Sequence, residues 1–128
     1  MVVVLKKGDK FRESFKEFLR RNRVNSGFFF GLGAVARPEL AFYDLTKKKY
    51  LKKKFAGLFE VLSITGNVAQ SGEEVAIHAH VVLGDDKFRT FGGHLIDAVI
   101  GGTLEINLIE SGLMERKLDD ETGLNLLK

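Results

Sequence analysis

The sequence predicts an α+β fold in which one helix accompanies a mainly antiparallel β-sheet. Apolar residues at helical spacing occur in one segment near the N-terminus, and short β-type runs separated by turn residues fill most of the remaining chain. One early helix followed by many strands, without alternation of the two, is typical of the α+β class. The length of 128 residues predicts a single domain, residues 1–128.

The first expected elements are a short strand and the helix. Residues 2–5 are an apolar run that predicts a buried strand. In residues 10–22, helical spacing places four apolar side chains on one face: Phe11, Phe15, Phe18 and Leu19. Asp9 directly precedes them and is the expected N-cap, because a short carboxylate accepts hydrogen bonds from the free N–H groups of a first turn.

The remaining elements are expected to be strands. Their β-type runs are residues 28–36, 40–43, 47–55, 59–68, 75–83, 87–91 and 96–109. Gly84-Asp85-Asp86 predicts the turn that brings residues 87–91 back beside residues 75–83. Lysines alternate with apolar side chains in residues 47–55, which is typical of an edge strand. The polar tail from Ser111 is expected to loop over the surface.

Amino-acid composition and charge exclude several kinds of functional site. There is no cysteine, which excludes disulfides, thiol catalysis and thiolate metal sites. The apolar run at the N-terminus is too short for a signal peptide or a membrane span, so a cytoplasmic protein without membrane association is expected. The net charge of +3 combines a strongly basic first half with an acidic second half. This split is compatible with a basic and an acidic face, with copies that pack head to tail, or with an ordinary solvated surface on both halves, and the last interpretation carries as much weight as the other two together.

The segment Gly31-Leu32-Gly33-Ala34-Val35-Ala36 fits the dinucleotide-binding pattern G-x-G-x-x-A. That mechanism needs the third position to open a helix, yet Pro38 follows closely and the segment has strand character. Glycines that permit close packing or a bulge in a strand are therefore the favoured interpretation. The phosphate-loop, H-E-x-x-H and G-x-S-x-G patterns are absent.

The histidines give the sharpest functional signal. His78 and His80 are two residues apart in an expected strand, so their side chains project from the same side, roughly 6–7 Å apart at the backbone. The turn after them lets His94 return to the same place, and Gly92-Gly93 would let a ligand approach the backbone. Three neutral imidazoles suit zinc or another divalent transition metal, with a fourth position left open. The alternative is three ordinary surface histidines.

A second cluster is basic. Six lysines surround Tyr50-Leu51: Lys47, Lys48, Lys49, Lys52, Lys53 and Lys54. Lysines bind nucleic-acid phosphates through charge, and interleaved aromatic side chains stack on bases. Lysine on an exposed edge strand also prevents aggregation, and that solvated-edge interpretation is favoured over the nucleic-acid one.

The order of these motifs resembles the PPC (plant and prokaryote conserved) domain, also called domain of unknown function 296, over essentially the whole chain. The resemblance rests on a series of segments: Gly31-Leu32-Gly33-Ala34-Val35, Leu40-Ala41-Phe42-Tyr43-Asp44, Phe59-Glu60-Val61-Leu62-Ser63-Ile64-Thr65-Gly66-Asn67, His78-Ala79-His80-Val81-Val82-Leu83, Gly92-Gly93-His94-Leu95, Glu105, Arg116, Asp119 and Thr122-Gly123-Leu124.

The resemblance implies that the helix packs on the antiparallel sheet, that the protein is a homotrimer, and that the three histidines bind a metal. In plants the domain follows AT-hook DNA-binding motifs and mediates assembly with itself and with transcription factors. No R-G-R-P hook occurs here, so this chain is similar to a stand-alone prokaryotic member. The partner-contact motif of the family, G-R-F-E-I-L, is matched by Gly57, Phe59, Glu60, Val61 and Leu62, with Leu58 in the arginine position.

These observations lead to a first hypothesis, a non-catalytic oligomerising and interaction protein, associated with DNA or with protein partners, that carries a three-histidine zinc site. The second hypothesis is a small metal-dependent enzyme in which the bound metal activates water and Glu60 or Glu105 is the general base. A third is the sensing of a small ligand at a subunit interface.

Overall fold

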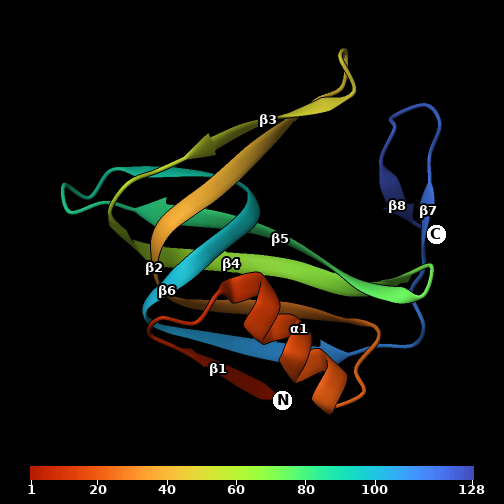
Figure 1. Cartoon of the computed structure of the whole chain (residues 1–128), viewed down its shortest axis with the longest axis horizontal. Coiled ribbons are helices and arrows are strands. Elements are labelled where there is room, and N and C mark those ends of the chain that lie inside the picture. Colours follow the sequence, from red (N-terminus) through yellow and green to blue (C-terminus); the bar gives the residue numbers. More distant parts are fainter.

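The computed structural model describes residues 1–128 and contains one helix and eight strands (Figure 1). The elements in chain order are β1 (Val2–Lys6), α1 (Phe11–Arg21), β2 (Gly27–Asp44), β3 (Lys49–Lys54), β4 (Leu58–Ser71), β5 (Glu74–Gly84), β6 (Thr90–Glu110), β7 (Arg116–Leu118) and β8 (Asn125–Leu127). The predicted fold class, a mainly antiparallel sheet with one helix, is confirmed. No helix has the length and apolar character needed to cross a membrane.

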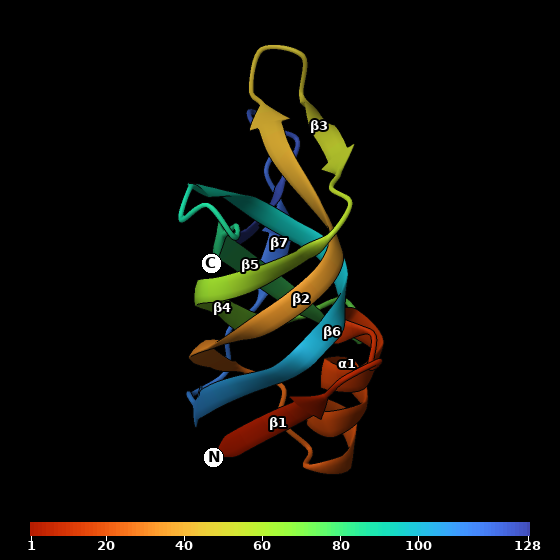
Figure 2. The ribbon, with the colours of Figure 1, turned by 90° about the vertical axis from the view of Figure 1, so that its left-hand side faces the viewer.

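Six strands form one antiparallel sheet in the order β1-β6-β5-β4-β2-β3. Strand β2 pairs with both β4 and β6, which closes β2, β4, β5 and β6 into a strongly curved, barrel-like ring (Figure 2). The hairpin of β2 and β3 projects beyond this ring, with β3 at the edge. The edge position predicted from the lysines is therefore confirmed.

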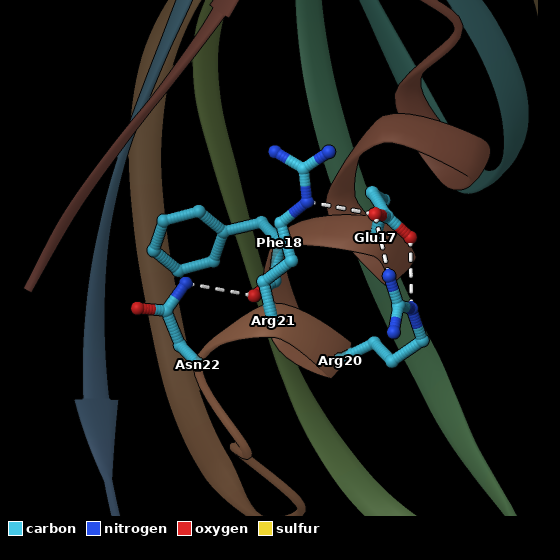
Figure 3. Close-up of polar contacts among 5 residues, drawn as sticks. All are labelled: Glu17, Phe18, Arg20, Arg21 and Asn22. Atoms are coloured by element: carbon cyan, nitrogen blue, oxygen red, sulfur yellow. Dashed lines mark hydrogen bonds and ion pairs between the residues drawn. The ribbon is translucent and has the colours of Figure 1, made fainter.

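The helix packs on one side of the sheet, against β1, β5 and β6 (Figure 2). Phe11, Phe15 and Leu19 are buried as the periodicity predicts, and the ring of Phe15 meets that of Phe29 edge to face at 5.0 Å. On the solvent side, the carboxylate of Glu17 accepts hydrogen bonds from Arg20 and Arg21 (Figure 3). A 22-residue apolar core fills the space between the helix and the inner face of the strands.

The expected capping role of Asp9 is wrong. The N-cap residue is Lys10, which makes no side-chain cap, and the carboxylate of Asp9 accepts the N–H of Lys6 at 2.8 Å instead. The carboxylate of Asp97 on β6 accepts the N–H of Arg12 at 3.1 Å and so caps the first turn from a distant strand. Because the capping residue lies on a distant strand, no local sequence pattern predicts this cap.

Two long strands replace four shorter predicted ones. Residues 28–36 and 40–43 are both part of β2. The pairing register shifts around Pro38, and at such a bulge the strand can continue without the backbone N–H that proline lacks. Residues 96–109 and the last two residues of the predicted strand 87–91 likewise belong to β6, which runs through Gly92-Gly93, whereas residues 87–89 lie in the turn before it. The polar tail forms a small hairpin of β7 and β8 rather than a loop.

The glycine-rich segment lies inside β2, as the strand interpretation predicts. A Cβ atom on Gly31 or Gly33 would collide with the backbone of Glu105 or Thr103 on β6. These glycines therefore allow two strands to approach closely, and no helix opens at this point.

Candidate metal centre

The three histidines lie on neighbouring strands and on the same, outward-facing side of the sheet. His78 and His80 are on β5, and His94 on β6 is the direct register partner of His80. Between His78 and His80, Ala79 points into the core and is fully buried. The alternation of strand side chains thus brings together the three residues that the sequence predicts.

The ring nitrogens are close enough to share one ion. One ligand nitrogen from each histidine can be chosen so that all three lie within 4.8 Å of one another, and the Nε2 atoms of His78 and His80 are 3.1 Å apart. Metal–nitrogen bonds of 2.0–2.1 Å in a tetrahedral site separate two ligand nitrogens by roughly 3.4 Å. The group fits a divalent transition metal.

The electrostatic surroundings keep two of these rings neutral. Burial, followed by the effects of the neighbouring His78, His80 and Arg12, lowers the pKa of His94 to about 4. Burial also lowers the pKa of His78, followed by the effects of His80, Arg116 and Arg12. Neutral imidazoles carry the free lone pair that a metal requires. At neutral pH both rings are therefore ready to bind a cation.

Arg12 of α1 braces the strands beside the histidines. Its guanidinium donates to the carbonyl oxygens of Ile77, Leu95 and Ile96 at 3.4, 3.4 and 3.0 Å. Ile77 precedes His78 on β5 and Leu95 follows His94 on β6. Through Arg12 the helix thus links the two histidine-bearing strands. No local pattern in the sequence indicates this role for Arg12.

Arg116 of β7 approaches the site from the C-terminal hairpin. Its Nη2 donates to Oδ1 of Asn67 on β4 and lies 3.4 Å from Nδ1 of His78. Its Nε is buried without a hydrogen-bond partner, and burial lowers the pKa of the guanidinium. Arg116 belongs to the pattern that carries the family resemblance, but no local signal indicates that it reaches His78.

Aromatic side chains lie beside His94. The ring of Tyr50 on β3 stacks on that of His94 with centroids 5.2 Å apart, and Tyr43 meets Tyr50 at 4.9 Å. The hydroxyl of Tyr43 donates to the carbonyl oxygen of Thr122, which ties the C-terminal hairpin to β2. These contacts were also missed, because they join segments far apart in the sequence.

An open hollow of about 530 Å³ lies beside the histidines. Its lining is mostly apolar: Ala41, Phe42, Tyr43, Tyr50, His78, His80, Val81, Val82, Gly92, Gly93, His94 and Leu124. The glycines do not open it in the way the sequence suggested, because a Cβ atom on Gly92 would collide with the backbone of Val81. A larger hollow of about 590 Å³, next to the end of α1, contains no histidine.

The predicted general bases are not at the site. Glu60 pairs with Gly84, four residues along β5 from His80, a distance of roughly 13 Å along a strand. Glu105 lies in the part of β6 that pairs with β1 and Leu32 of β2, away from His94. Neither joins the three histidines as a possible metal ligand. The enzyme hypothesis therefore lacks the carboxylate it expected.

The six lysines lie on the projecting hairpin and are exposed. Lys47 and Lys48 are in the turn, and the other four are on β3. The Nζ of Lys48 donates to the carbonyl oxygen of Asp120, and Nζ of Lys53 lies 4.9 Å from the centre of the Phe55 ring. The rest of this basic surface is open to solvent.

The motif matched to the family's partner contact lies at the start of β4. Gly57 has a φ of 108°, a conformation that favours glycine, and Phe59 packs edge to face on Phe91 at 5.3 Å. Val61 is buried, whereas Glu60 and Leu62 are exposed. Phe59 and Val61 thus pack with the core, whereas the exposed side chains of Glu60 and Leu62 are available for contacts.

The family model of the Plants and Prokaryotes Conserved (PCC) domain matches residues 1–112. Among curated proteins, the chain is 28% identical over 120 residues to bifunctional protein GlmU of Synechococcus sp. (strain JA-3-3Ab). The match covers 91% of this chain and 18% of that protein, so the chain spans less than a fifth of the relative's length.

Three solved structures are similar over nearly the whole chain. A plant- and prokaryote-conserved (PPC) protein of Pyrococcus horikoshii is 26% identical with a TM-score of 0.93, covering 100% of this chain and 90% of that one. A metal-containing protein of Archaeoglobus fulgidus is 33% identical, with a TM-score of 0.91 and coverages of 98% and 90%. A candidate DNA-binding protein of Bacteroides thetaiotaomicron is 26% identical, with a TM-score of 0.92 and coverages of 99% and 90%.

Proposed function

This chain belongs to the Plants and Prokaryotes Conserved (PCC) domain family, and we propose that residues 1–128 act as a single, non-catalytic, oligomerising interaction domain that binds a divalent transition metal, in the first place zinc, at His78, His80 and His94. The observation that carries the proposal is the convergence of three ligand nitrogens within 4.8 Å. The similar protein of Archaeoglobus fulgidus contains a metal, which supports the same role for this chain.

The chemistry of the donors favours zinc. Three imidazoles with no thiolate and no carboxylate suit a tetrahedral ion whose fourth position stays open to water or an anion. The bound ion would link β5 to β6 and so stabilise the pairing of His80 with His94. The residues described here hold and orient the ion, and none of the predicted bases is placed to take a proton from water.

Calorimetric titration with zinc tests this proposal. We expect one equivalent to bind at pH 7.5, and binding to be lost in His80→Ala. The matched control is Thr65→Ala, which changes the register partner of His80 on β4 without removing a nitrogen donor. Equal binding by wild type and His80→Ala would contradict the proposed site.

A homotrimer is the proposed assembly, formed through the side of the sheet that faces away from α1. Six exposed apolar side chains, which we call the outer apolar face, project from β1, β2 and β6: Val2, Val4, Phe28, Phe30, Leu32 and Ile109. Their register partners on these strands include Asn107 and Glu105, so the patch is mainly apolar with a few polar groups. Exposed apolar side chains gathered on one side of a sheet are typical of protein–protein contacts.

DNA association is a second candidate, favoured by one observation. Six lysines lie exposed on a hairpin that projects from the molecule, and such a surface attracts a phosphate backbone without reading bases (Figure 1). The Bacteroides thetaiotaomicron relative, a candidate DNA-binding protein, supports the same proposal. A cytoplasmic location agrees with either role and with a chain that contains no cysteine.

A further inference from the structure

We infer that the hollow beside the histidines is a binding site for a small organic carboxylate with an apolar body, whose carboxylate takes the open position of the metal. This inference rests on the proposed metal binding and adds the chemical class of the ligand. It comes from three properties of the hollow: the charge at its base, the character of its walls and its size.

The charge at the base of the hollow selects an anion. The three histidines bring no negative charge, and no Asp or Glu lines the hollow or joins the metal-binding group. A divalent ion held there keeps its full charge, and the nearby guanidinium groups of Arg12 and Arg116 add to the positive potential. An anionic ligand would be favoured by this potential, whereas a neutral one would gain little from it.

The walls select an apolar body. Seven of the twelve lining residues are hydrophobic: Ala41, Phe42, Tyr43, Tyr50, Val81, Val82 and Leu124. The Tyr43 hydroxyl is already engaged with the carbonyl oxygen of Thr122, so it is not a free donor for a ligand. A phosphate or a sugar would need several polar partners that these walls do not offer. The ring of Tyr50, held against His94, provides a flat surface for stacking.

Size limits the ligand to a small molecule. The hollow of about 530 Å³ lies within the range of ordinary ligand sites, and it is open on one side. A ligand with one aromatic ring would therefore bury only part of its surface. We expect a dissociation constant between roughly 10 μM and 1 mM for such a ligand.

The C-terminal hairpin supplies one wall through Leu124. The hairpin is held over the site by the bond from Tyr43 to Thr122 and by the bond from Lys48 to Asp120. Gly123 is adjacent and has a φ of 76°, and a Cβ atom there would lie 3.1 Å from the Tyr43 hydroxyl. The position of Leu124 therefore depends on a glycine turn packed against the hydroxyl of Tyr43.

The test uses the full chain loaded with cobalt(II), whose visible absorption reports on its ligands, and benzoate as the probe. We expect benzoate to shift the cobalt spectrum saturably. It should bind at least about tenfold more tightly than acetate, because only benzoate has an apolar ring that contacts the walls of the hollow. Benzyl alcohol, which has the ring but no charge, is expected to cause no shift at the same concentrations.

Two variants separate the ligand from the metal. Leu124→Ser removes part of the apolar wall without adding a carboxylate that could itself take the open position of the metal, and it is expected to weaken benzoate binding about fivefold while acetate binds as it does to wild type. Leu113→Ser, at a 72% exposed position of the same terminal segment, is the control and is expected to bind benzoate like wild type.

Each other outcome contradicts a specific step. A normal cobalt spectrum that benzoate does not change would overturn the ligand site and leave the metal site intact. Equal affinities for benzoate and acetate would overturn the role of the apolar walls, and an equal response to benzyl alcohol would overturn the charge argument. Failure to take up cobalt at all would instead overturn the proposed metal site, and the carboxylate site with it.

Discussion

The Nε2 atoms of His78 and His80 lie 3.1 Å apart, so in the hydrogen bond between the two neutral rings one nitrogen donates its N–H and the other accepts it. Burial disfavours the charged forms of His78 and His94, and the neighbouring histidines add to this effect. The pKa of His94 falls to about 4, and that of His78 is lowered as well. His78 and His94 therefore stay neutral at pH values at which ordinary histidines become charged, and their neutral rings can bind a metal.

The first prediction concerns the stability of the metal-free protein as a function of pH. His94 has a usual pKa near 6.5 when unfolded and about 4 when folded. The unfolded chain therefore binds more protons between these values, and stability is lost as pH falls from 6.5 to 4. Because the ring is half exposed, we expect His94 to contribute roughly 1–2 kcal/mol to this loss.

Urea unfolding at pH 7, 6 and 5 checks this expectation. His94→Gln, which keeps a polar side chain that does not titrate, is the matched variant and should flatten the dependence on pH. Identical slopes for the wild type and His94→Gln would show that His94 titrates normally.

The second prediction concerns Arg116. Removing its positive charge in Arg116→Ala is expected to raise the pKa of His78, because the guanidinium is one of the groups that lowers it. Loss of the hydrogen bonds to Asn67 and to the carbonyl oxygen of Asn125 should also loosen the C-terminal hairpin. Titration of His78 by NMR in metal-free protein measures the first effect, and amide hydrogen exchange of β7 and β8 measures the second.

Arg116→Lys is the control, because it keeps the charge but loses the planar donor geometry of the guanidinium. It should retain a low pKa for His78 while still releasing the hairpin in part. If Arg116→Ala and wild type share the same His78 pKa, the electrostatic role of Arg116 is refuted.

The third prediction concerns the outer apolar face. Phe30 is 51% exposed at the centre of this face, between Asn107 of β6 and Thr65 of β4. Phe30→Asp would place a charge in the proposed trimer contact and is expected to convert a trimeric mass to a monomeric one. Light scattering on a size-exclusion column gives the mass directly.

Phe88→Asp is the matched control, since Phe88 is 95% exposed in the turn between β5 and β6, away from this face. It should leave the mass unchanged. A wild type that is strictly monomeric at micromolar concentration would refute the trimer, and a trimeric Phe30→Asp would place the contact elsewhere.

The fourth prediction concerns the basic hairpin. If DNA contacts β3, Lys52→Glu combined with Lys53→Glu should weaken binding at least tenfold. The slope of the logarithm of affinity against the logarithm of salt concentration should fall by about the amount expected for two lost phosphate contacts. Gel shifts at several salt concentrations measure both effects. The control combines Lys6→Glu with Lys7→Glu, which makes the same charge change at two exposed lysines near α1. Equal weakening by both pairs would indicate attraction by net charge alone, and no shift at low salt would exclude DNA.

Local patterns were sufficient to predict the helix, most strands and the meeting of the three histidines. Each depends on short-range geometry: the spacing of Phe11 and Phe15, or the alternation that puts His78 and His80 on one side. The turn between β5 and β6 then brings His94 back within seventeen residues of His78.

The parts that could not be predicted join distant segments. Asp97 caps α1 from β6, Arg116 reaches His78 from the tail, and Tyr50 stacks on His94 from the edge strand. Polar and aromatic residues of this kind have many possible partners, and only the closed sheet selects among them. Strands β2 and β6 were each predicted as two strands, because a bulge or a glycine pair gives the same local signal as the end of a strand.

The most direct test of the central claim is elemental analysis of the protein purified without a histidine tag, alongside His78→Ala and His94→Ala. The three-histidine site predicts close to one equivalent of zinc or another divalent transition metal per chain in the wild type and essentially none in either variant. A wild type that holds no metal even after zinc is added back, or variants that retain it in full, would contradict the site.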